Sequence, residues 1–339
     1  MDGEVDITEM ENKPHIYILA TGGTISAKAA DKTFTTGYTA STIGVRELVE
    51  AVPEMERYAR ISGEQVTNVL SHSLTHDVWL KLGRRINGLF GLPDVDGIVV
   101  THGTNTLEET AYFLNLVVKS EKPVIVTGAM RPATAISADG PANLLSAVRL
   151  AVSREALGQG VMVFLNDQIN SARDVSKTHT TALDTFRSPE MGALGTLHEG
   201  TAFFFRSSTR RNTLRSEFDI STLAELPRVD ILYSHVNDDL VHLRAILAAG
   251  AKGIVVAATG NGMMSDTVHR GLVEARNHGI VVVRSSRCGS GMVTKIKLYD
   301  ESGFVAAGAC NPAKARILLM LALTKTAEPS EIQRMFDEY

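Results

Sequence analysis

Cysteine is scarce in this chain of 339 residues, which contains only Cys288 and Cys310. Two cysteines are too few for the disulfide framework of a small secreted protein or for a four-cysteine metal site. We therefore expect a reducing compartment, the cytoplasm, although a periplasmic protein whose leader had been removed would look the same. The acidic and polar residues 1–14 lack the basic and apolar regions of a signal peptide, and we expect them to form a flexible tail.

An excess of positive charge and long apolar runs are also missing. The net charge is −4, whereas a nucleic-acid-binding protein needs a basic face for phosphates. No apolar run approaches the roughly 18–20 residues that span a membrane. These two absences argue against nucleic acid and against a membrane as partners.

Short apolar runs alternate with amphipathic segments along most of the chain. Residues 16–20, 65–70, 97–100 and 124–126 are predicted to form strands, with helices between them. Alternation of this kind predicts an α/β fold with parallel sheets, helices on both faces and right-handed crossovers. Residues 166–205 break the alternation and predict hairpins, so that the sheets are expected to be parallel or mixed.

Composition also divides the chain into two domains. The polar stretch 206–226, which contains RSSTRRNTLRSEF, reads as a linker, and strand–helix alternation resumes after it. We expect an N-terminal α/β domain over residues 15–205 and a C-terminal α/β domain over residues 227–339.

Two threonines follow glycines at the ends of two predicted strands. Thr24 closes the sequence ATGGT, and Thr104 closes the sequence THGT. Since open α/β sheets bind ligands at the carboxyl ends of their strands, both hydroxyls are candidates for chemistry. A threonine is nevertheless more often a turn residue that fills a hydrogen bond, and that interpretation stays open at this point.

A threonine hydroxyl is a weak nucleophile until a neighbour takes its proton. Lys177 is the candidate base, because lysine loses its charge readily when it is buried. Tyr38, in the long Gly- and Thr-rich stretch 28–42, is a candidate to relay the proton or to cover the site. With no metal-ligand set, these residues suggest acyl transfer through a threonine ester. The absence of a G-x-G-x-x-G motif argues against nicotinamide chemistry.

Five segments resemble the bacterial type II L-asparaginases and glutaminase-asparaginases: ATGGTI at 20–25, GEQV at 63–66, THGTNTLEETAYFL at 101–114, GAMRPATAISADGP at 128–141 and NPAKARILLMLALT at 311–324. The resemblance extends from about residue 15 to the C-terminus. It implies hydrolysis of a small-molecule side-chain amide to the acid and ammonia, without a metal or an organic cofactor. It also implies a homotetramer in which each active site lies between the N-terminal domain of one subunit and the C-terminal domain of another.

The same resemblance assigns roles to individual residues. Thr24 matches the primary nucleophile of the family, and Tyr38 matches its flexible-loop tyrosine. Thr104 matches the second catalytic threonine, and Lys177 matches its lysine partner. Ser71 matches the serine that binds the α-carboxylate of the substrate.

The part of the pocket that would face the substrate α-ammonium departs from the family pattern. Position 105 is Asn105 where the family has aspartate, and His72 stands where it has glutamine or glutamate. Met263 replaces an asparagine or serine, and the acidic residue that often follows RSSR has no clear counterpart in residues 288–299. Because the aspartate charge beside Lys177 is gone, we expect the neutral form of that lysine to be easier to reach.

Three hypotheses about function remain open on the sequence. The chain hydrolyses L-asparagine or a close analogue, or it is an amidase for a related carboxamide whose α-ammonium is absent or modified. Alternatively, it is a non-catalytic amide- or amino-acid-binding protein on the same fold. The complete set of threonines, lysine and tyrosine argues against the binding protein, which has no need of a nucleophile and its base.

Overall fold

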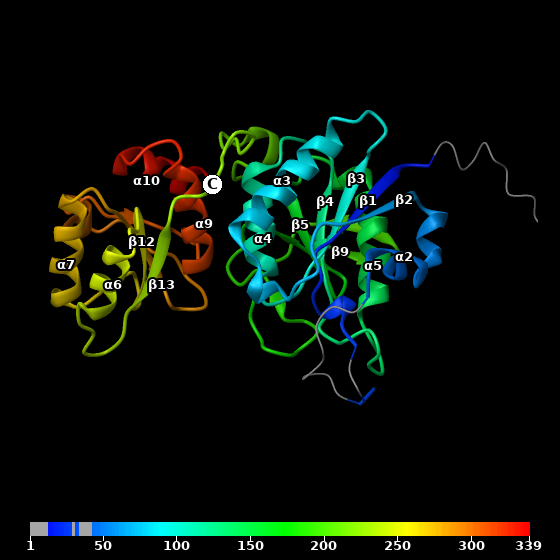
Figure 1. The fold of residues 1–339 in the computed structure, drawn as a ribbon, viewed down its shortest axis with the longest axis horizontal. Helices are drawn as coiled ribbons and strands as arrows, with labels where there is room; N and C mark the ends of the chain where they lie inside the picture. Colours follow the sequence, from blue (N-terminus) through cyan, green and yellow to red (C-terminus); the bar gives the residue numbers. More distant parts are fainter. Residues whose placement is uncertain (1–12, 29–30, 34–42) are drawn as a thin grey trace, which may run out of the picture. The chain divides into compact units, whose positions relative to one another are not determined.

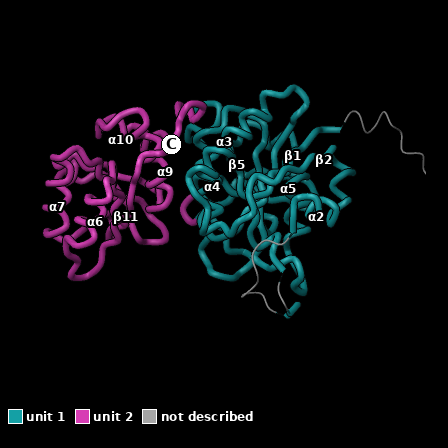
Figure 2. The backbone as a smooth tube through the Cα atoms, in the orientation of Figure 1, with its two compact units in different colours: residues 1–188, 192–216 teal, residues 189–191, 217–339 magenta. Residues whose placement is uncertain are grey.

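The computed structural model describes residues 13–28, 31–33 and 43–339. The chain forms two compact units, one over residues 1–188 and 192–216 and the other over residues 189–191 and 217–339 (Figure 2). Each unit has its own sheet and its own covering helices, as predicted for a two-domain α/β protein.

The first unit is built on an eight-stranded mixed sheet in the order β10-β9-β6-β5-β4-β3-β1-β2. Its five strands from β5 to β2 are parallel, whereas β6, β9 and β10 join antiparallel. The strands are β1 (His15–Ala20), β2 (Arg60–Gln65), β3 (Gly97–Thr101), β4 (Val124–Thr127), β5 (Val161–Leu165), β6 (Gln168–Ser171), β9 (Gly195–His198) and β10 (Thr201–Phe204). A separate two-stranded ladder joins β7 (Ser176–Lys177) to β8 (Phe186–Arg187), so the predicted hairpins are confirmed.

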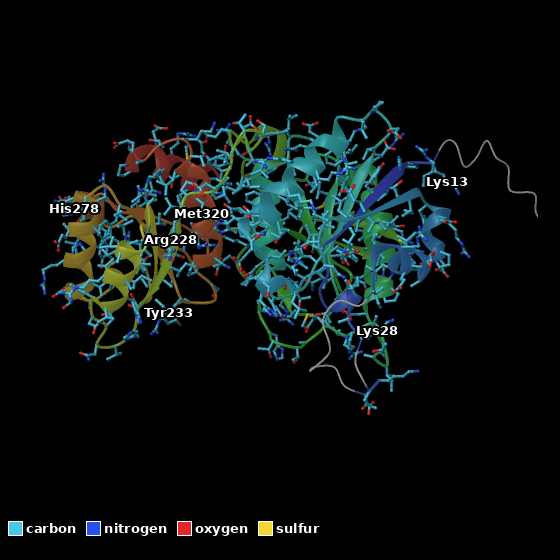
Figure 3. All side chains as sticks on the ribbon, viewed as in Figure 1. Lys13, Lys28, Arg228, Tyr233, His278 and Met320 are labelled. Atoms are coloured by element: carbon cyan, nitrogen blue, oxygen red, sulfur yellow. The ribbon has the colours of Figure 1, made fainter. Side chains whose placement is uncertain are left out.

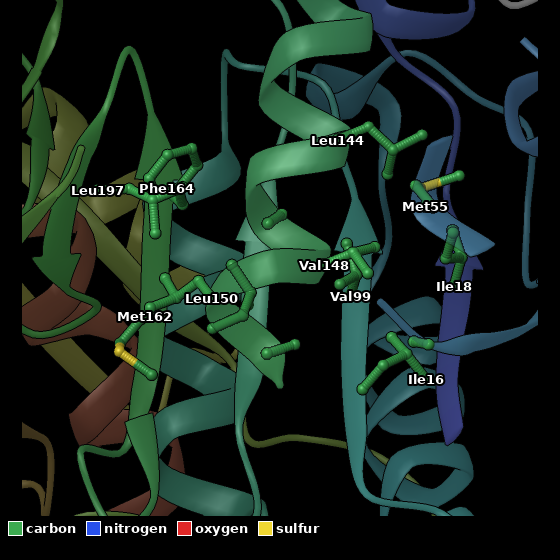
Figure 4. Close-up of a cluster of buried hydrophobic side chains, with 14 of the residues drawn as sticks. Ile16, Ile18, Met55, Val99, Leu144, Val148, Leu150, Met162, Phe164 and Leu197 are labelled. Carbon is green, nitrogen blue, oxygen red and sulfur yellow. The ribbon is translucent and has the colours of Figure 1, made fainter. Parts of the chain in front are cut away.

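Helices cover both faces of this sheet (Figure 1). On one face lie α3 (His76–Phe90) and α4 (Leu107–Val117), and on the other lie α2 (Val45–Glu50) and α5 (Gly140–Ala151). Apolar side chains of α5, such as Leu144 and Val148, pack with Ile18, Val99 and Met162 from three strands (Figure 4). The short 3₁₀ helices of the unit are η1 (Thr24–Ser26), η2 (Pro53–Arg57), η3 (Ser71–Ser73), η4 (Arg154–Ala156) and η5 (Thr213–Arg215).

The prediction of uniformly right-handed crossovers is wrong for one connection. Strands β3, β4 and β5 follow one another across the sheet in a single direction, yet α4 and α5 lie on opposite faces. Two such crossovers must have opposite hands, and the one through α5 is the left-handed one, since the connections through α2, α3 and α4 share the usual hand. The strand predicted at 65–70 is also wrong, because the residues that pair with β1 are Arg60–Gln65. The strand ends where the Gln65 side chain turns back to donate to the carbonyl of Ala20.

The second unit is a four-stranded parallel sheet in the order β11-β12-β13-β14. Its strands are β11 (Val229–Tyr233), β12 (Gly253–Ala258), β13 (Val281–Ser286) and β14 (Val305–Ala306), and its helices are α6 (Val241–Ala248), α7 (Asp266–Asn277), α8 (Lys297–Glu301), α9 (Pro312–Ala322) and α10 (Pro329–Glu338). Met320 of α9, labelled in Figure 3, is fully buried. Among the described helices of both units, none combines the length and apolarity needed to cross a membrane.

Arg284 holds the loops of the second unit together from inside the sheet. Its guanidinium is fully buried and lies over the ring of Tyr299 at 4.3 Å, and it donates to the carbonyl of Thr294 at 2.8 Å. Burial lowers the pKa of this guanidinium from its usual value. The residue therefore has a structural role, rather than binding an anion from solution.

Two glycines allow the turns after β1 and β3 to meet at the carboxyl edge of the large sheet. A Cβ atom on Gly23 would lie only 2.3 Å from the Cα atom of Gly103, and Gly23 has a φ of +93°. A Cβ atom on Gly103 would in turn lie 2.8 Å from Oγ of Ser71. Only glycine fits this contact, because any side chain would push the two backbones apart.

We expect Gly23→Ala to lower the free energy of unfolding by about 2–5 kcal/mol, from backbone strain and overlap with Gly103. The control is Gly88→Ala on the exposed side of α3, where a Cβ atom meets nothing within 4 Å. That change should stabilise the helix by up to about 1 kcal/mol. Denaturant unfolding of both variants measures the difference, and equal midpoints for Gly23→Ala and wild type would contradict the crowding at the turn.

Candidate active site

The strand order of the first unit reverses direction beside β1. From β1 the chain moves outward to β2 and then returns to β3 on the other side, before it continues to β4 and β5. Ligands of open α/β sheets bind outside the carboxyl ends of the strands at such a switch point. Thr24 follows β1 and Thr104 follows β3, so both threonines lie at this position in the sheet.

The turn that carries Thr24 is shaped by backbone bonds. The amide of Ser26 donates to the carbonyl of Gly23 at 3.0 Å, and the amide of Ala27 donates to that of Thr24 at 3.0 Å. Thr24 is only 4% exposed. The hydroxyl of Thr21, just before the turn, donates to the carbonyl of Thr101 at 2.9 Å and ties the end of β1 to the end of β3.

Thr104 and Asn105 both contact Lys177, which comes from β7, 73 residues further along the chain. Nζ of Lys177 lies 2.9 Å from Oγ1 of Thr104 and 3.3 Å from Oδ1 of Asn105. The lysine is half-buried, whereas Thr104 is 5% exposed. The candidate base is therefore within hydrogen-bond distance of a candidate hydroxyl.

Burial lowers the pKa of the Lys177 ammonium, and the negative charge of Glu108 opposes that shift. Glu108, in the first turn of α4, also accepts the backbone N–H of Lys177 at 2.9 Å. It is the acidic residue that steadies this part of the site, and the sequence reasoning missed it. The available signal was its place one helical turn after Thr104.

The loop that follows Lys177 is closed by its own side chains. Nδ1 of His179 accepts the backbone N–H groups of Thr181 and Ala182 at 3.1 and 3.0 Å. The amide of Thr178 donates to the carbonyl of Thr185 at 2.8 Å. These bonds fix the short β7–β8 hairpin that carries the lysine, and the sequence reasoning did not single them out.

Ser71 and His72 approach the same place from η3. The hydroxyl of Thr106 donates to the carbonyl of Ser71 at 2.8 Å, which joins η3 to the start of α4. Nδ2 of Asn105 lies 3.3 Å from Nδ1 of His72. An open cavity of about 320 Å³ borders this cluster and is lined by Asn105, Lys177, Thr178, His179 and Thr180.

Two of the residues predicted from the sequence lie outside the part of the first unit that the structure describes. Tyr38 lies outside the described residues. Met263 belongs to the second unit, where it is 45% exposed and closes a turn by exchanging backbone bonds with Thr259. The first unit therefore brings together Thr104, Asn105, Lys177 and His72, with Ser71 and Thr24 in the adjoining turns.

Comparison with protein families identifies both parts of the chain. The family model described as Asparaginase, N-terminal matches residues 15–210, and the one described as Glutaminase/Asparaginase C-terminal domain matches residues 228–336.

Individual relatives match over nearly the whole chain. The chain is 53% identical over 332 residues to L-asparaginase 2 of Bacillus subtilis, which covers 98% of this chain and 88% of the relative. It is 46% identical over 328 residues to L-asparaginase 2 of Escherichia coli, which covers 96% and 93%. A crystal structure of a probable cytoplasmic L-asparaginase from Campylobacter jejuni superposes with a TM-score of 0.95 at 48% identity, over 96% of this chain and 100% of that one. With both of its domains matched, this chain belongs to the asparaginase family.

Proposed function

We propose that this protein hydrolyses the side-chain amide of L-asparagine to L-aspartate and ammonia. Its relatives in Bacillus subtilis and Escherichia coli are named L-asparaginases. The observation that carries the proposal is the 2.9 Å contact between Lys177 and Thr104 at the switch point of the sheet. A half-buried lysine with a lowered pKa beside a buried hydroxyl is the arrangement that proton transfer requires.

In the proposed reaction, Oγ1 of Thr24 attacks the amide carbon of the substrate. The C–N bond then breaks, and the proton that leaves the Thr24 hydroxyl ends on the departing ammonia, with Tyr38 as the relay. Water attacks the resulting ester, the bond to Oγ1 breaks, and Thr24 regains a proton. In this scheme, backbone N–H groups of the turns after β1 and β3 stabilise the oxyanion that forms in both steps.

Lys177 acts in this scheme through its neutral amine. As an ammonium it donates to Thr104, but once deprotonated it has a lone pair that accepts the Thr104 hydroxyl proton. Thr104 can then take a proton from the attacking water and later return it. The two threonines thus have different roles, one as the nucleophile and the other as a proton carrier.

The binding part of the pocket is proposed to hold the substrate through Ser71, His72 and Asn105, with Met263 contributed by a neighbouring subunit of the proposed tetramer. Ser71 would bind the α-carboxylate. At Asn105 the substrate ammonium meets a neutral amide oxygen instead of a carboxylate, and a hydrogen bond to a charged group is worth about 1.5–3 kcal/mol. We therefore expect L-asparagine to be a slow substrate for a member of this family.

We also propose a homotetramer in the cytoplasm. The support for an assembly is a set of exposed apolar side chains in the second unit, on β11, in the loop after it and at the start of α6. Val236 is 93% exposed, and Ile231, Tyr233 and Val241 are also exposed (Tyr233 is labelled in Figure 3). The support for the location is the relative from Campylobacter jejuni, which is described as probably cytoplasmic.

The test of the proposed function is ammonia release from L-asparagine, L-glutamine, D-asparagine and succinamate. We expect release from L-asparagine, a loss of at least about 10³-fold in Thr24→Ala, and a loss of about 10²–10⁴-fold in Lys177→Met. Silence on all four amides, or wild-type rates in Thr24→Ala, would contradict the proposal.

Asn105→Asp should improve L-asparagine as a substrate. Restoring a carboxylate opposite the α-ammonium is expected to raise kcat/KM by about 10–100-fold, from the 1.5–3 kcal/mol of a charged hydrogen bond. Asn277→Asp at the exposed end of α7 makes the same change of net charge in the second unit and serves as the control. An unchanged kcat/KM in Asn105→Asp would show that position 105 does not meet the ammonium.

The same variant should move the acid limb of the kcat profile to higher pH. A carboxylate stabilises the ammonium form of Lys177 and so raises its pKa. Because the base must be neutral, a higher pKa means that activity is lost earlier as the pH falls. Profiles of kcat against pH for wild type and Asn105→Asp test this, and a limb that stays in place or moves to lower pH would contradict the role of Lys177 as base.

A further inference from the structure

We propose that His72 is a positioning residue that acts through Asn105. By accepting a hydrogen bond from the Asn105 amide, it keeps the amide oxygen directed at Lys177 and so leaves the lysine lone pair for Thr104. This inference rests on the proposed function, in which Lys177 is the base. The family pattern described above has other residue types at both positions.

The chemistry of the three side chains fixes the direction of their bonds. An ammonium can only donate, so Lys177 at 3.3 Å must face the oxygen of the Asn105 amide. The NH₂ end of the same amide then faces His72, where Nδ2 lies 3.3 Å from Nδ1. Since an NH₂ group only donates, Nδ1 of His72 must accept, and the ring must be neutral with its hydrogen on Nε2.

Protonation of His72 reverses this arrangement. An imidazolium carries hydrogens on both nitrogens, so its Nδ1–H would point at the N–H of Asn105. The amide relieves that contact by turning over, which gives its oxygen to His72 and its NH₂ group to Lys177. The NH₂ group then donates to the lone pair of the neutral lysine and competes with the hydroxyl of Thr104.

Few other charged groups can account for such an effect. Glu108 of α4 accepts the backbone N–H of Lys177, and its negative charge raises the pKa of the lysine ammonium. His76 and Asp77 lie in the first turn of α3, where His76 stacks on Trp79 at 5.6 Å. Nδ1 of His179, beside the same cavity, already accepts two backbone N–H groups. Within the described chain, the side-chain bond from His72 goes to Asn105.

A carboxylate at position 105 would not act as this switch. Both of its oxygens accept, so it serves a donor on each side whichever way it turns. Asn105→Asp is therefore the matched control. It keeps the shape of the side chain, but it replaces an amide with one donor end and one acceptor end by a carboxylate with two acceptors. His72→Gln removes the titrating ring, because glutamine still forms hydrogen bonds but does not take up a proton.

The test is a set of four kcat profiles against pH, for wild type, His72→Gln, Asn105→Asp and the double variant. In wild type the acid limb should depend on two protons, with a slope approaching 2 on a log scale, and in His72→Gln it should depend on one. In the Asn105→Asp background, His72→Gln should leave the slope unchanged. Equal slopes in wild type and His72→Gln would overturn the proposal, as would the same loss of slope in both backgrounds.

A second measurement separates this proposal from the proposed function. Nitrogen NMR of histidine-labelled protein without substrate reports the tautomer of each ring, and His72→Gln identifies the signal. We expect the neutral ring of His72 to carry its proton on Nε2 in wild type and on Nδ1 in Asn105→Asp, where a carboxylate accepts from that nitrogen. An Nδ1–H tautomer in wild type would overturn the proposal even if L-asparagine is hydrolysed. The expected tautomer would stand even if no tested amide is a substrate.

Discussion

The contact between the backbones at Gly23 and Gly103 is the constraint on which the rest of the site depends. It brings the turn after β1 against the turn after β3, and so places Thr24 and Thr104 in adjoining loops at the switch point. Ser71 also lies against Gly103. Three separate stretches of the chain are thus packed together by the absence of two side chains.

The remaining chemistry comes from outside the parallel strands. Lys177 reaches Thr104 from a short hairpin, and Glu108 holds the backbone of that lysine from α4. The hydroxyls sit on the rigid edge of the sheet, whereas the base is held by side-chain bonds. Burial favours the neutral amine and the nearby acid favours the ammonium, so the two act on the pKa of Lys177 in opposite directions, and burial has the larger effect.

Much of this arrangement can be predicted from the sequence, and there are physical reasons why the rest cannot. Thr24 and Thr104 follow buried strands, and strand ends in a parallel sheet share one edge, so their common location follows from local pattern. The bond between Lys177 and Thr104 joins residues 73 apart and has no local signal. Likewise, the pairing of His72 with Asn105 depends on how η3 packs against α4. The left-handed crossover through α5 was missed because apolar periodicity carries no information on which face of a sheet a helix will cover.

The small size of the β7–β8 ladder has a consequence for how this protein responds to heat. Ser176 and Lys177 are the whole of β7, and they pair with only Phe186 and Arg187. A ladder of this size can open while the eight-stranded sheet stays folded, because local openings cost less than global unfolding. Opening the hairpin withdraws the base but leaves both threonines in place. Thermal inactivation can therefore be reversible and can precede the melting of the fold.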